Sequence, residues 1–584
     1  MYPNAPKNPL NTAELLAQPW QRWLYRPLQP LVERFFDFRG AWKLYADAGG
    51  DAVQADLFAR KILQLRQVEW SLPQADLDTL RTIDGPLVIA ANHPYGGIDS
   101  FILIDLLEQI RPADWKLFSN HILENVRPLT PHRIPVDALG MSADGQRTNA
   151  RAMRTALQHL RGGGALALFP ARRVAYRDPP LGAVVDFDWS DHAVKLAART
   201  GAHLVCLHFP GHNSERFLRI PKNYPLLRGL MLCRELTQSP ARKIHLRIAM
   251  TLNPKTNADL QRDPRAAQKL RARVHLEDDL RSVPKKKASA PPPEDASTEN
   301  ELPADAPPPE SFRLFSKAPF DVYLFRGDAS PAQLDLLGRA RSITFRAAGQ
   351  GTGKEVDLSP EDDYYHHLIV WDTAAGRLAG AYRIGIVPEI LAEHGQTGLY
   401  LDHVFHIDPA FFKRFPRSLE LSRSFVLPDY QKDNRVLPLL WQGLAATSTR
   451  HQVDTLFGSV TISAAHHPAT RALLVEYLKN NYADASGTIQ LVRAREPFVP
   501  ETRYHPLVAE AYAGEGLNAL KPLIDDIEGG ERSIPPLMRY YCQLGAKYIG
   551  YHVEADFGNA LYCLLRVHLP SIPKAYQRRF NPPS

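Results

Sequence analysis

The stretch ANHPYGGID, residues 91–99, joins a short apolar run to a helical pattern and decides the fold of the first half of the chain. The apolar run from Pro86 to Ala91 predicts a buried strand, and the pattern from Ile98 to Ile110 predicts a helix. Further apolar runs at 165–169 and 203–209 alternate with helical patterns. This order predicts an α/β fold, in which chemistry gathers at the carboxyl ends of the strands.

His93 and Asp99 follow the carboxyl end of this first strand, on either side of a glycine pair. Gly96 and Gly97 permit backbone angles that other residues resist, so that Asp99 can fold back onto the imidazole. A histidine oriented by an aspartate can act as a general base that activates a hydroxyl group. The same pattern is also typical of a turn with a buried, hydrogen-bonded histidine, and the spacing alone does not separate the two.

The 584 residues are too many for one hydrophobic core, so we expect two folded domains. From Val283 to Pro309 the composition changes from Lys-rich to Ala/Pro-rich and then to acidic. A segment of this composition cannot bury enough apolar surface to order itself. We therefore predict a first domain at 1–282, a disordered tether at 283–310 and a second domain at 311–584.

The composition is that of a globular protein with a basic surface. Hydrophobic residues make up 44% and charged residues 23% of the chain, the net charge is +7 and the isoelectric point is near 9.0. A basic chain favours acidic partners, which include nucleic acid, anionic lipid and an acidic carrier protein. No stretch matches a nucleic-acid-binding module, so we do not expect nucleic acid. The 4 cysteines lie far apart and lack metal-ligand spacing, which predicts reduced side chains in a cytoplasmic protein and no metal site.

The sequence predicts a protein that does not cross a membrane but can lie on one. No uninterrupted apolar stretch approaches the roughly 18 residues that span a bilayer, and the N-terminal region lacks the apolar centre of a signal peptide. Aromatic residues stand beside arginines at 20–26, and apolar residues then recur at helical spacing among basic ones. The recurring residues are Leu31, Phe35, Phe38, Trp42 and Tyr45. They form either an interfacial helix on an anionic membrane or an amphipathic helix packed on its own domain. We expect a cytoplasmic protein, peripheral on the inner face of the cytoplasmic membrane.

Later segments continue the pattern that begins at His93 and Asp99. They are Arg133–Asp137, Phe169-Pro170, Leu207–Gly211 and Leu232–Leu236. Together these motifs resemble the glycerolipid (lysophospholipid) acyltransferase family over about residues 80 to 250. The resemblance implies that His93 deprotonates an acceptor hydroxyl, which then attacks an acyl thioester.

The chain departs from this family in two places. Five residues, rather than the usual four, separate His93 from Asp99. At the third motif the family usually has Phe-Pro-Glu-Gly-Thr-Arg, whereas this chain has Phe169-Pro170-Ala171-Arg172-Arg173. The missing glutamate helps to hold a phosphate-bearing acceptor in the family, so its absence argues against lysophosphatidate. Arg172 or Arg173 can instead pair with a carboxylate in a bidentate fork.

In the second domain, strands predicted at 367–371 and 380–384 precede the segment Leu419–Val426, and a helical pattern follows at 437–446. This order resembles the GNAT superfamily. The particular segments Glu-x-x-Arg-Ser, Trp-Gln-Gly and Leu-Phe-Gly-Ser resemble the branch of the ornithine N-acyltransferases, which is related to the acyl-homoserine lactone synthases. The resemblance covers most of residues 320–565.

This second resemblance implies roles for four residues. Glu420 accepts a proton from an amine nucleophile, and Arg423 grips an acidic group of the substrate or fixes Glu420. Arg383 and Asp556 match substrate-binding positions of the family. The alternative is a strand-end salt bridge between Glu420 and Arg423, with structural roles for Arg383 and Asp556.

The loop before the predicted helix, from Tyr430 to Val436, contains no glycine. GNAT enzymes that use coenzyme A usually have glycines there, which leave room for the pyrophosphate. Side chains such as Asp433 crowd a free nucleotide, so we expect a donor carried on acyl carrier protein rather than acyl-coenzyme A, and no bound cofactor. The candidate docking charges, unless they are simply a solvated face, are Lys413, Arg414, Arg417, Lys432 and Arg435.

Two acyltransferase domains of different types imply two acylations of one molecule, as in the bifunctional ornithine-lipid synthases that the chain resembles. The second domain would join a 3-hydroxyacyl group to the α-amine of an amino acid, with ornithine as the leading candidate. The first domain would then esterify the hydroxyl of this lyso-aminolipid. The alternatives are a phosphoglyceride acyltransferase fused to an acetyltransferase, a non-catalytic hemolysin-like membrane protein and an acyl-homoserine lactone synthase.

Overall fold

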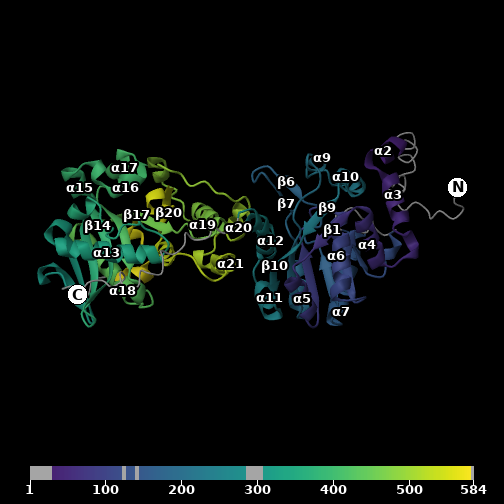
Figure 1. The fold of residues 1–584 in the computed structure, drawn as a ribbon, viewed down its shortest axis with the longest axis horizontal. Coiled ribbons are helices and arrows are strands. Elements are labelled where there is room, and N and C mark those ends of the chain that lie inside the picture. Colours follow the sequence, from purple (N-terminus) through teal and green to yellow (C-terminus); the bar gives the residue numbers. More distant parts are fainter. Residues whose placement is uncertain (1–28, 121–125, 138–143, 284–306, 581–584) are drawn as a thin grey trace. The chain divides into compact units, whose positions relative to one another are not determined.

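The computed structural model describes residues 29–120, 126–137, 144–283 and 307–580 (Figure 1). The chain divides into two compact units, Met1–Ser282 and Val283–Ser584. The aromatic stretch at 20–26 and the part of the predicted tether from 284 to 306 lie outside the described residues.

The described part of the first unit is built on a six-stranded sheet in the order β10-β8-β2-β5-β3-β4. Its strands run parallel except β10, which pairs antiparallel with β8 at one edge. The strands are β2 (Leu87–Ala91), β3 (Trp115–Asn120), β4 (Arg133–Val136), β5 (Ala165–Leu168), β8 (His203–His208) and β10 (Arg247–Leu252). Because β2 lies between β5 and β8, its carboxyl end opens at the middle of the sheet.

Helices cover both faces of this sheet, as Figure 1 shows. Alternate residues of β2 enter two different cores, Ile89 on one face and Val88 on the other, because successive residues of a strand point to opposite faces. The first core includes α4 (Ala55–Leu65), α5 (Gln74–Thr82) and α6 (Gly97–Ile110), and the second includes α7 (Gly145–Arg161), α8 (His192–Thr200) and α12 (Ala266–Ser282). The unit is therefore a three-layer α/β/α domain, which confirms the predicted fold class.

The apolar residues between 31 and 45 form two helices rather than one, α2 (Gln29–Phe36) and α3 (Phe38–Asp47). Asp37 separates them with a left-handed φ of 59°, and its side chain caps α3 by accepting a hydrogen bond from the Gly40 N–H. Tyr45 of α3 is buried, so α3 packs on its own domain. Leu31 and Phe35 of α2 remain 67% and 55% exposed.

The described part of the second unit contains an eight-stranded sheet in the order β11-β12-β13-β14-β16-β17-β20-β19. Neighbouring strands are antiparallel except β16 and β17, which are parallel and joined through α18 (Val436–Arg450). The strands are β11 (Arg313–Lys317), β12 (Phe320–Arg326), β13 (His366–Asp372), β14 (Arg377–Ile386), β16 (Ser418–Val426), β17 (Thr455–Ile462), β19 (Lys547–Glu554) and β20 (Ala560–His568). The predicted strands at 367–371 and 380–384 and the helix at 437–446 are confirmed as β13, β14 and α18.

The parallel pair separates toward its carboxyl ends. Ser418–Leu421 of β16 pairs with Thr455–Gly458 of β17, and beyond these residues β16 pairs with β14 and β17 with β20. The helix α13 (Pro331–Ala347) packs on the face of the sheet that carries Phe425. The divergence leaves an opening between two strand edges, directly after Leu421 and next to Glu420.

Candidate active sites

In the first unit, the turn from β2 to α6 brings His93 and Asp99 together as the sequence predicted. Gly96 has a φ of 91°, a conformation that side chains rarely adopt, and this tight turn places Asp99 in the first turn of α6. One carboxylate oxygen of Asp99 lies 3.0 Å from Nδ1 of His93 and also accepts hydrogen bonds from the N–H groups of Tyr95 and Gly96. Asp99 is fully buried, so its position is fixed by the fold.

The imidazole of His93 is held in one orientation with its second nitrogen free. Its ring stacks on Phe169, with 3.9 Å between the ring centroids, and its side chain is 14% exposed. Among the described residues none hydrogen bonds Nε2. A histidine whose Nδ1 is anchored to a carboxylate can accept a proton at Nε2 from a bound hydroxyl group.

Asn92 joins the motif at His93 to the later motif Leu207–Gly211, which lies at the end of β8. The Asn92 amide donates to the carbonyl of Phe209 over 2.8 Å and accepts from its N–H over 2.7 Å. This pair ties the carboxyl ends of β2 and β8 together beside His93.

The two arginines of the altered third motif occupy different environments. Arg172 has a left-handed φ of 62° and an exposed side chain. Arg173 lies 3.9 Å above the ring of Phe187, and burial lowers its pKa. Neither guanidinium forms an ion pair with a described residue.

A third cation lies behind this loop, and the sequence analysis missed it. Arg228 of α10 (Pro225–Gln238) is buried and donates to the carbonyls of Val174 and Ala175. Burial and the charge of Arg173 lower the pKa of Arg228 to about 10. The loop after Phe169 is therefore positively charged, and none of the ion pairs found in the described residues involves these three arginines.

In the second unit, Glu420 is buried at the point where β16 and β17 begin to separate. One carboxylate oxygen accepts a hydrogen bond from the Tyr365 hydroxyl and the other from the Leu401 N–H, both at 2.9 Å. Burial raises the pKa of Glu420 to about 7. A carboxylate with such a pKa is suited to accept and release a proton near neutral pH.

Arg423 reaches the same face of the sheet as Glu420 through a bulge. In a regular strand, residues three apart point to opposite faces. Here the register of β16 against β14 shifts next to Arg423, which has a left-handed φ of 48°. Its guanidinium lies 3.1 Å from Asp357 and donates to the Tyr400 hydroxyl over 2.9 Å. Glu420 and Arg423 form no ion pair, so the salt bridge between these two residues, given above as the alternative, is wrong.

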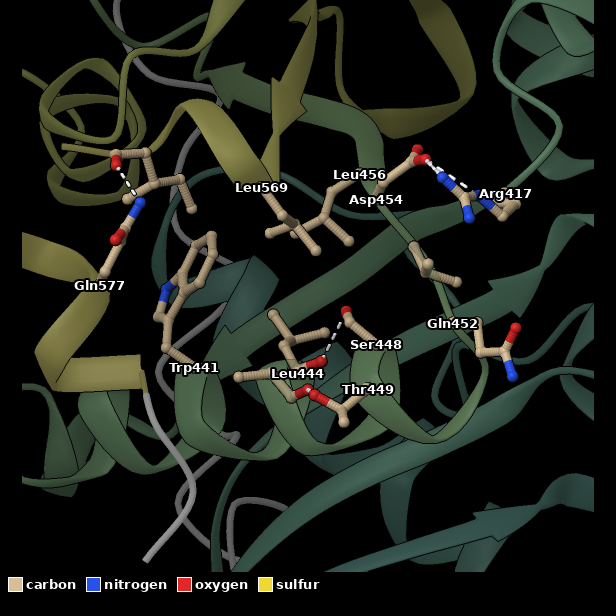
Figure 2. A pocket seen from close by; sticks show the side chains of 13 residues that line it. Arg417, Trp441, Leu444, Ser448, Thr449, Gln452, Asp454, Leu456, Leu569 and Gln577 are labelled. Carbon is tan, nitrogen blue, oxygen red and sulfur yellow. Dashed lines mark hydrogen bonds and ion pairs between the residues drawn. The ribbon is translucent and has the colours of Figure 1, made fainter. Parts of the chain in front are cut away.

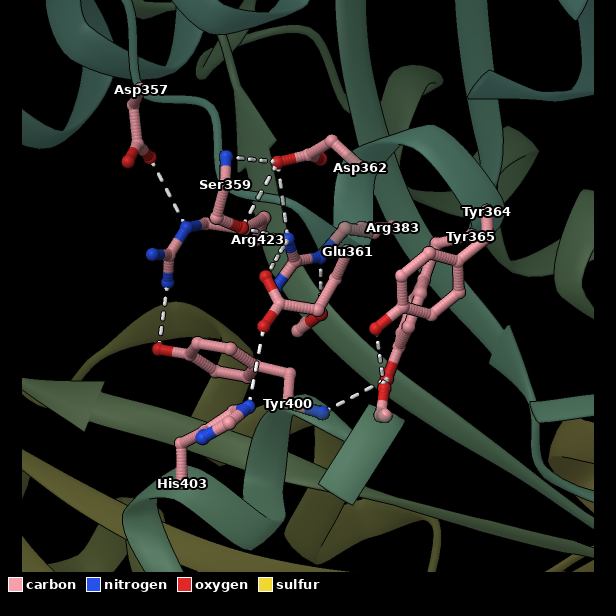
Figure 3. A network of polar contacts seen from close by, with 12 residues as sticks. Asp357, Ser359, Glu361, Asp362, Tyr364, Tyr365, Arg383, Tyr400, His403 and Arg423 are labelled. Atoms are coloured by element: carbon pink, nitrogen blue, oxygen red, sulfur yellow. Dashed lines mark hydrogen bonds and ion pairs between the residues drawn. The ribbon is translucent and has the colours of Figure 1, made fainter. Parts of the chain in front are cut away.

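Arg383 is the centre of a buried polar network (Figure 3). It donates to the hydroxyls of Ser422 and Ser359 and lies 3.1 Å from Asp362. Its Nη2 has no hydrogen-bond partner in the part of the chain that the structure describes. Burial alone would raise the pKa of Asp362, but Arg383 and Arg341 hold it below its usual range.

Comparisons with known proteins agree with this two-site arrangement. Residues 61–240 match the family described as Acyltransferase, and residues 340–442 match the acetyltransferase (GNAT) domain family. A glycine N(alpha)-acyltransferase of Bacteroides thetaiotaomicron is 31% identical over 261 residues, which are 42% of this chain and 77% of that protein. The chain belongs to the amino-acid Nα-acyltransferase family.

Two further relatives bear the names of an N-acyltransferase and an O-acyltransferase. An L-ornithine N(alpha)-acyltransferase of Agrobacterium fabrum is 29% identical over 210 residues, which are 35% of this chain and 64% of that protein. A lyso-glycine lipid O-acyltransferase of Phocaeicola vulgatus is 26% identical over 137 residues, 24% of this chain and 46% of that protein. This acyltransferase thus combines an acyltransferase domain with a GNAT domain, as the sequence resemblance predicted.

Asp556 of this acyltransferase does not join the polar network. It is exposed at the turn between β19 and β20, and none of the hydrogen bonds or ion pairs found in the described residues involves its carboxylate. Its neighbour Phe557 does reach the site, because Arg423 lies 5.1 Å above the Phe557 ring.

Glu420, Arg383 and Arg423 each have one partner in a segment that the sequence analysis did not single out. The segment 357–365 carries Asp357, Asp362 and Tyr365 directly before β13. A run of acids and tyrosines ahead of a predicted buried strand was the available signal. It was missed because acidic residues in a loop are usually solvated.

A cavity of about 620 Å³ in the second unit lies away from Glu420 (Figure 2). It is lined by residues of α18 and by Leu456 of β17, whose register partner is Leu419. Because Leu419 and Glu420 are successive residues of a strand, the cavity lies on the face opposite Glu420. At its rim Arg417 pairs with Asp454, so this candidate docking charge already has a partner.

The described residues contain neither a metal-binding cluster nor a membrane-spanning helix. No group of three or more His, Cys, Asp or Glu side chains there is arranged to hold a metal ion. None of the helices that the structure describes combines the length and the apolar composition of a membrane span.

Proposed function

We propose that the GNAT unit transfers a 3-hydroxyacyl group to the α-amine of an amino acid and that the first unit then acylates the new hydroxyl. The product is a phosphorus-free aminolipid with one amide-linked and one ester-linked chain. The observation that carries the first step is the buried Glu420 at the opening between β16 and β17. The proposal also follows the names of the relatives, which act on glycine, ornithine and a lyso-glycine lipid.

In the first step, Glu420 accepts a proton from the amine, directly or through water, while the amine attacks the carbonyl carbon of the acyl thioester. The C–N bond forms, the C–S bond breaks and the thiol of the donor leaves. In this proposal Arg383 binds the amino-acid carboxylate, because its Nη2 is a buried donor without a partner among the described residues. Arg423 is engaged by Asp357 and Tyr400, which favours an orienting role for it.

The turn ahead of α18 supports acyl carrier protein as the donor. The carboxylate of Asp433 accepts a hydrogen bond from the Arg435 N–H over 2.9 Å and pairs with its guanidinium. A negative side chain therefore occupies the helix end where a pyrophosphate would bind. Lys413, Arg414 and Lys432 are exposed and remain candidates for docking an acidic carrier.

A direct comparison of donors tests this assignment. We expect the purified chain to have a much higher kcat/KM with 3-hydroxyacyl carrier protein than with the matching coenzyme A thioester. Lys432→Glu should raise the KM for the carrier and leave kcat unchanged, and added salt should weaken the wild-type interaction. Equal kcat/KM values for both donors would contradict a carrier-specific site.

In the second step, His93 deprotonates the 3-hydroxyl of the lyso-aminolipid, which attacks the carbonyl carbon of a second acyl thioester, while Asp99 orients the imidazole. The ester C–O bond forms, the C–S bond breaks, and the donor leaves as a thiol after its sulfur takes the proton from His93. The cationic loop suits a negatively charged acceptor, and in a lyso-aminolipid that charge is the carboxylate. Arg172 and Arg173 lack carboxylate partners within the described residues, and each can form a bidentate pair with that group.

We also propose that the first unit works on an anionic membrane surface. Leu31 and Phe35 of α2 are exposed, and Arg234 of α10 donates to the Phe35 carbonyl, which ties these two helices together. On or next to α10, Leu226 and Tyr224 are 54% and 56% exposed. The same helix covers the catalytic turn, so a lipid acceptor held at this surface would lie near His93.

Mass spectrometry of lipids from a host without aminolipids, expressing this chain, tests the two-step function. The wild type should produce the doubly acylated lipid, His93→Ala the singly acylated amide, and Glu420→Gln neither. Fragment ions distinguish ornithine from glycine as the head group. An unchanged aminolipid profile, with folded protein and both acyl donors present, would contradict the proposal.

A further inference from the structure

Asp186 is a buried carboxylate next to His93 that the proposed mechanism does not use. It follows β7 (Ala183–Val185) and has no solvent exposure. One of its oxygens accepts a hydrogen bond from the backbone N–H of His93 over 3.1 Å, and the other accepts from the indole N–H of Trp189 over 2.8 Å. Burial raises the pKa of Asp186 to about 6, so the group is mostly ionised at neutral pH.

The backbone of His93 is held on both sides. Its N–H is bound by Asp186, and its carbonyl accepts a hydrogen bond from the Ala175 N–H over 2.9 Å. These contacts come from segments that lie far from His93 in the sequence. They fix the main chain from which the imidazole extends, while Asp99 fixes the imidazole itself.

The segment that carries Asp186 is anchored to the last helix of the unit. The Asp186 N–H donates to Nε2 of His275, and its carbonyl accepts from Arg271, both on α12. Burial lowers the pKa of His275 to about 3, so its ring is neutral and Nε2 can accept this hydrogen bond. The position of the carboxylate is therefore determined by α12.

The same segment touches the other parts of the site. Ser190 donates through its N–H and its hydroxyl to the carbonyl of Pro170, next to Phe169, on which His93 stacks. Phe187 supports the guanidinium of Arg173. The segment from Asp186 to Ser190 thus contacts the base, the stacking turn and the proposed carboxylate-binding arginine.

We propose that Asp186 is a positioning residue for O-acyl transfer, which fixes the position of the His93 backbone and so holds the imidazole where it can take the proton of the acceptor hydroxyl. This inference rests on the proposed function of the first unit. Its physical basis is that a general base misplaced by even a fraction of an ångström loses much of its effect.

The test measures O-acylation of a lyso-aminolipid by the full-length chain. Asp186→Asn retains the shape of the side chain, but it cannot accept from both partners at once because one acceptor becomes an NH₂ donor. We expect kcat to fall about 10-fold to 100-fold, with the KM for the acceptor within about twofold of wild type. Trp189→Phe removes one of the two donors to Asp186 and should lower kcat by about fivefold.

Three controls separate the outcomes. Asp259→Asn, at a carboxylate that is 66% exposed on α11 (Pro254–Leu260) and outside the site, should leave kcat unchanged. If the wild type has no O-acylation that depends on His93, the proposed function of the unit fails, whatever Asp186 does. If wild type is active and His93→Ala is not, a folded Asp186→Asn with wild-type kcat, or one altered in KM alone, overturns the positioning role. Should Asp186→Asn fail to fold, an unchanged kcat in Trp189→Phe overturns it instead.

Discussion

At the scale of single residues, Glu420, the proposed base of N-acyl transfer, also affects the stability of the second unit. Its pKa is about 7 in the folded protein against an ordinary value of 4.5, because burial disfavours the charged form. Such a group contributes stability that is fully present below the unfolded pKa and is lost as the pH rises through the folded pKa. An ionised Glu420 therefore destabilises the second unit by about 3 kcal/mol at alkaline pH.

We predict that Glu420→Gln lowers the rate of N-acylation by about 100-fold or more. The variant should also gain stability relative to wild type as the pH increases from about 5 to about 8. Differential scanning calorimetry at several pH values measures the second effect as a widening gap between the two Tm values. Glu393→Gln, at a carboxylate that is half exposed, is the matched control and should show a constant gap. A pH-independent gap for Glu420→Gln would mean that the carboxylate ionises normally.

The residue pairs differ in how well the sequence predicted them. His93 and Asp99 meet as expected, because two glycines between them leave few alternatives to a tight turn. Glu420 and Arg423 lie on the same face of the sheet only because β16 has a bulge at Arg423, whose backbone φ is left-handed. The spacing of residues in the sequence does not predict such a bulge. Asp186 was not predictable at all, since its contact with His93 spans 93 residues and depends on the anchoring of its segment by α12.

At the scale of elements, the close packing of α10 against the start of α6 fixes the conformation of the turn that carries His93 and Asp99. A Cβ on Gly96 would lie 2.9 Å from Leu232 of α10 and 3.1 Å from Val174, and the φ of 91° is unfavourable for any L side chain. At Gly97 the nearest atom, on Leu236, would be at an ordinary 3.6 Å. The two glycines of the turn therefore have different roles despite standing side by side.

We predict that Gly96→Ala destabilises the first unit by about 1 to 3 kcal/mol and lowers the kcat of O-acylation, because the turn that aims Asp99 must shift. Gly97→Ala, the matched control, should be close to wild type in both respects. N-acylation by the other unit provides an internal reference for the amount of active protein. Similar losses in the two variants would show that the position of the turn does not limit catalysis.

Regular elements were the most predictable part of this fold. The strands β2, β5 and β8 and the helices α6 and α18 follow from apolar runs and helical periodicity, which depend on local sequence alone. The division of 31–45 into α2 and α3 depends instead on Asp37, whose left-handed backbone leaves no signal in the apolar spacing. The separation of β16 from β17 cannot be predicted from local sequence either, because it depends on the pairing of β16 with β14 and of β17 with β20.

At the scale of the whole molecule, each unit has its own hydrophobic cores. The cores around β2 contain only residues before Ser282, and those around α13 and β20 only residues after Val283. Each candidate site is likewise assembled within one unit. Because the two proposed reactions take place in units with separate hydrophobic cores, a substitution that disables one site should leave the other site intact.

We predict that a mixture of His93→Ala and Glu420→Gln proteins restores the doubly acylated lipid, although neither variant makes it alone. The intermediate has a single acyl chain, and one chain gives only reversible membrane binding, so the lyso-aminolipid made by one protein can reach the other. The measurement is the ratio of lyso-lipid to final product over time by mass spectrometry, with the His93→Ala/Glu420→Gln double variant as the control. The mixture should accumulate more lyso-lipid than wild type before it is consumed. Persistent lyso-lipid with no final product would instead mean that the intermediate stays with the chain that makes it, so that both acylations must occur in one molecule.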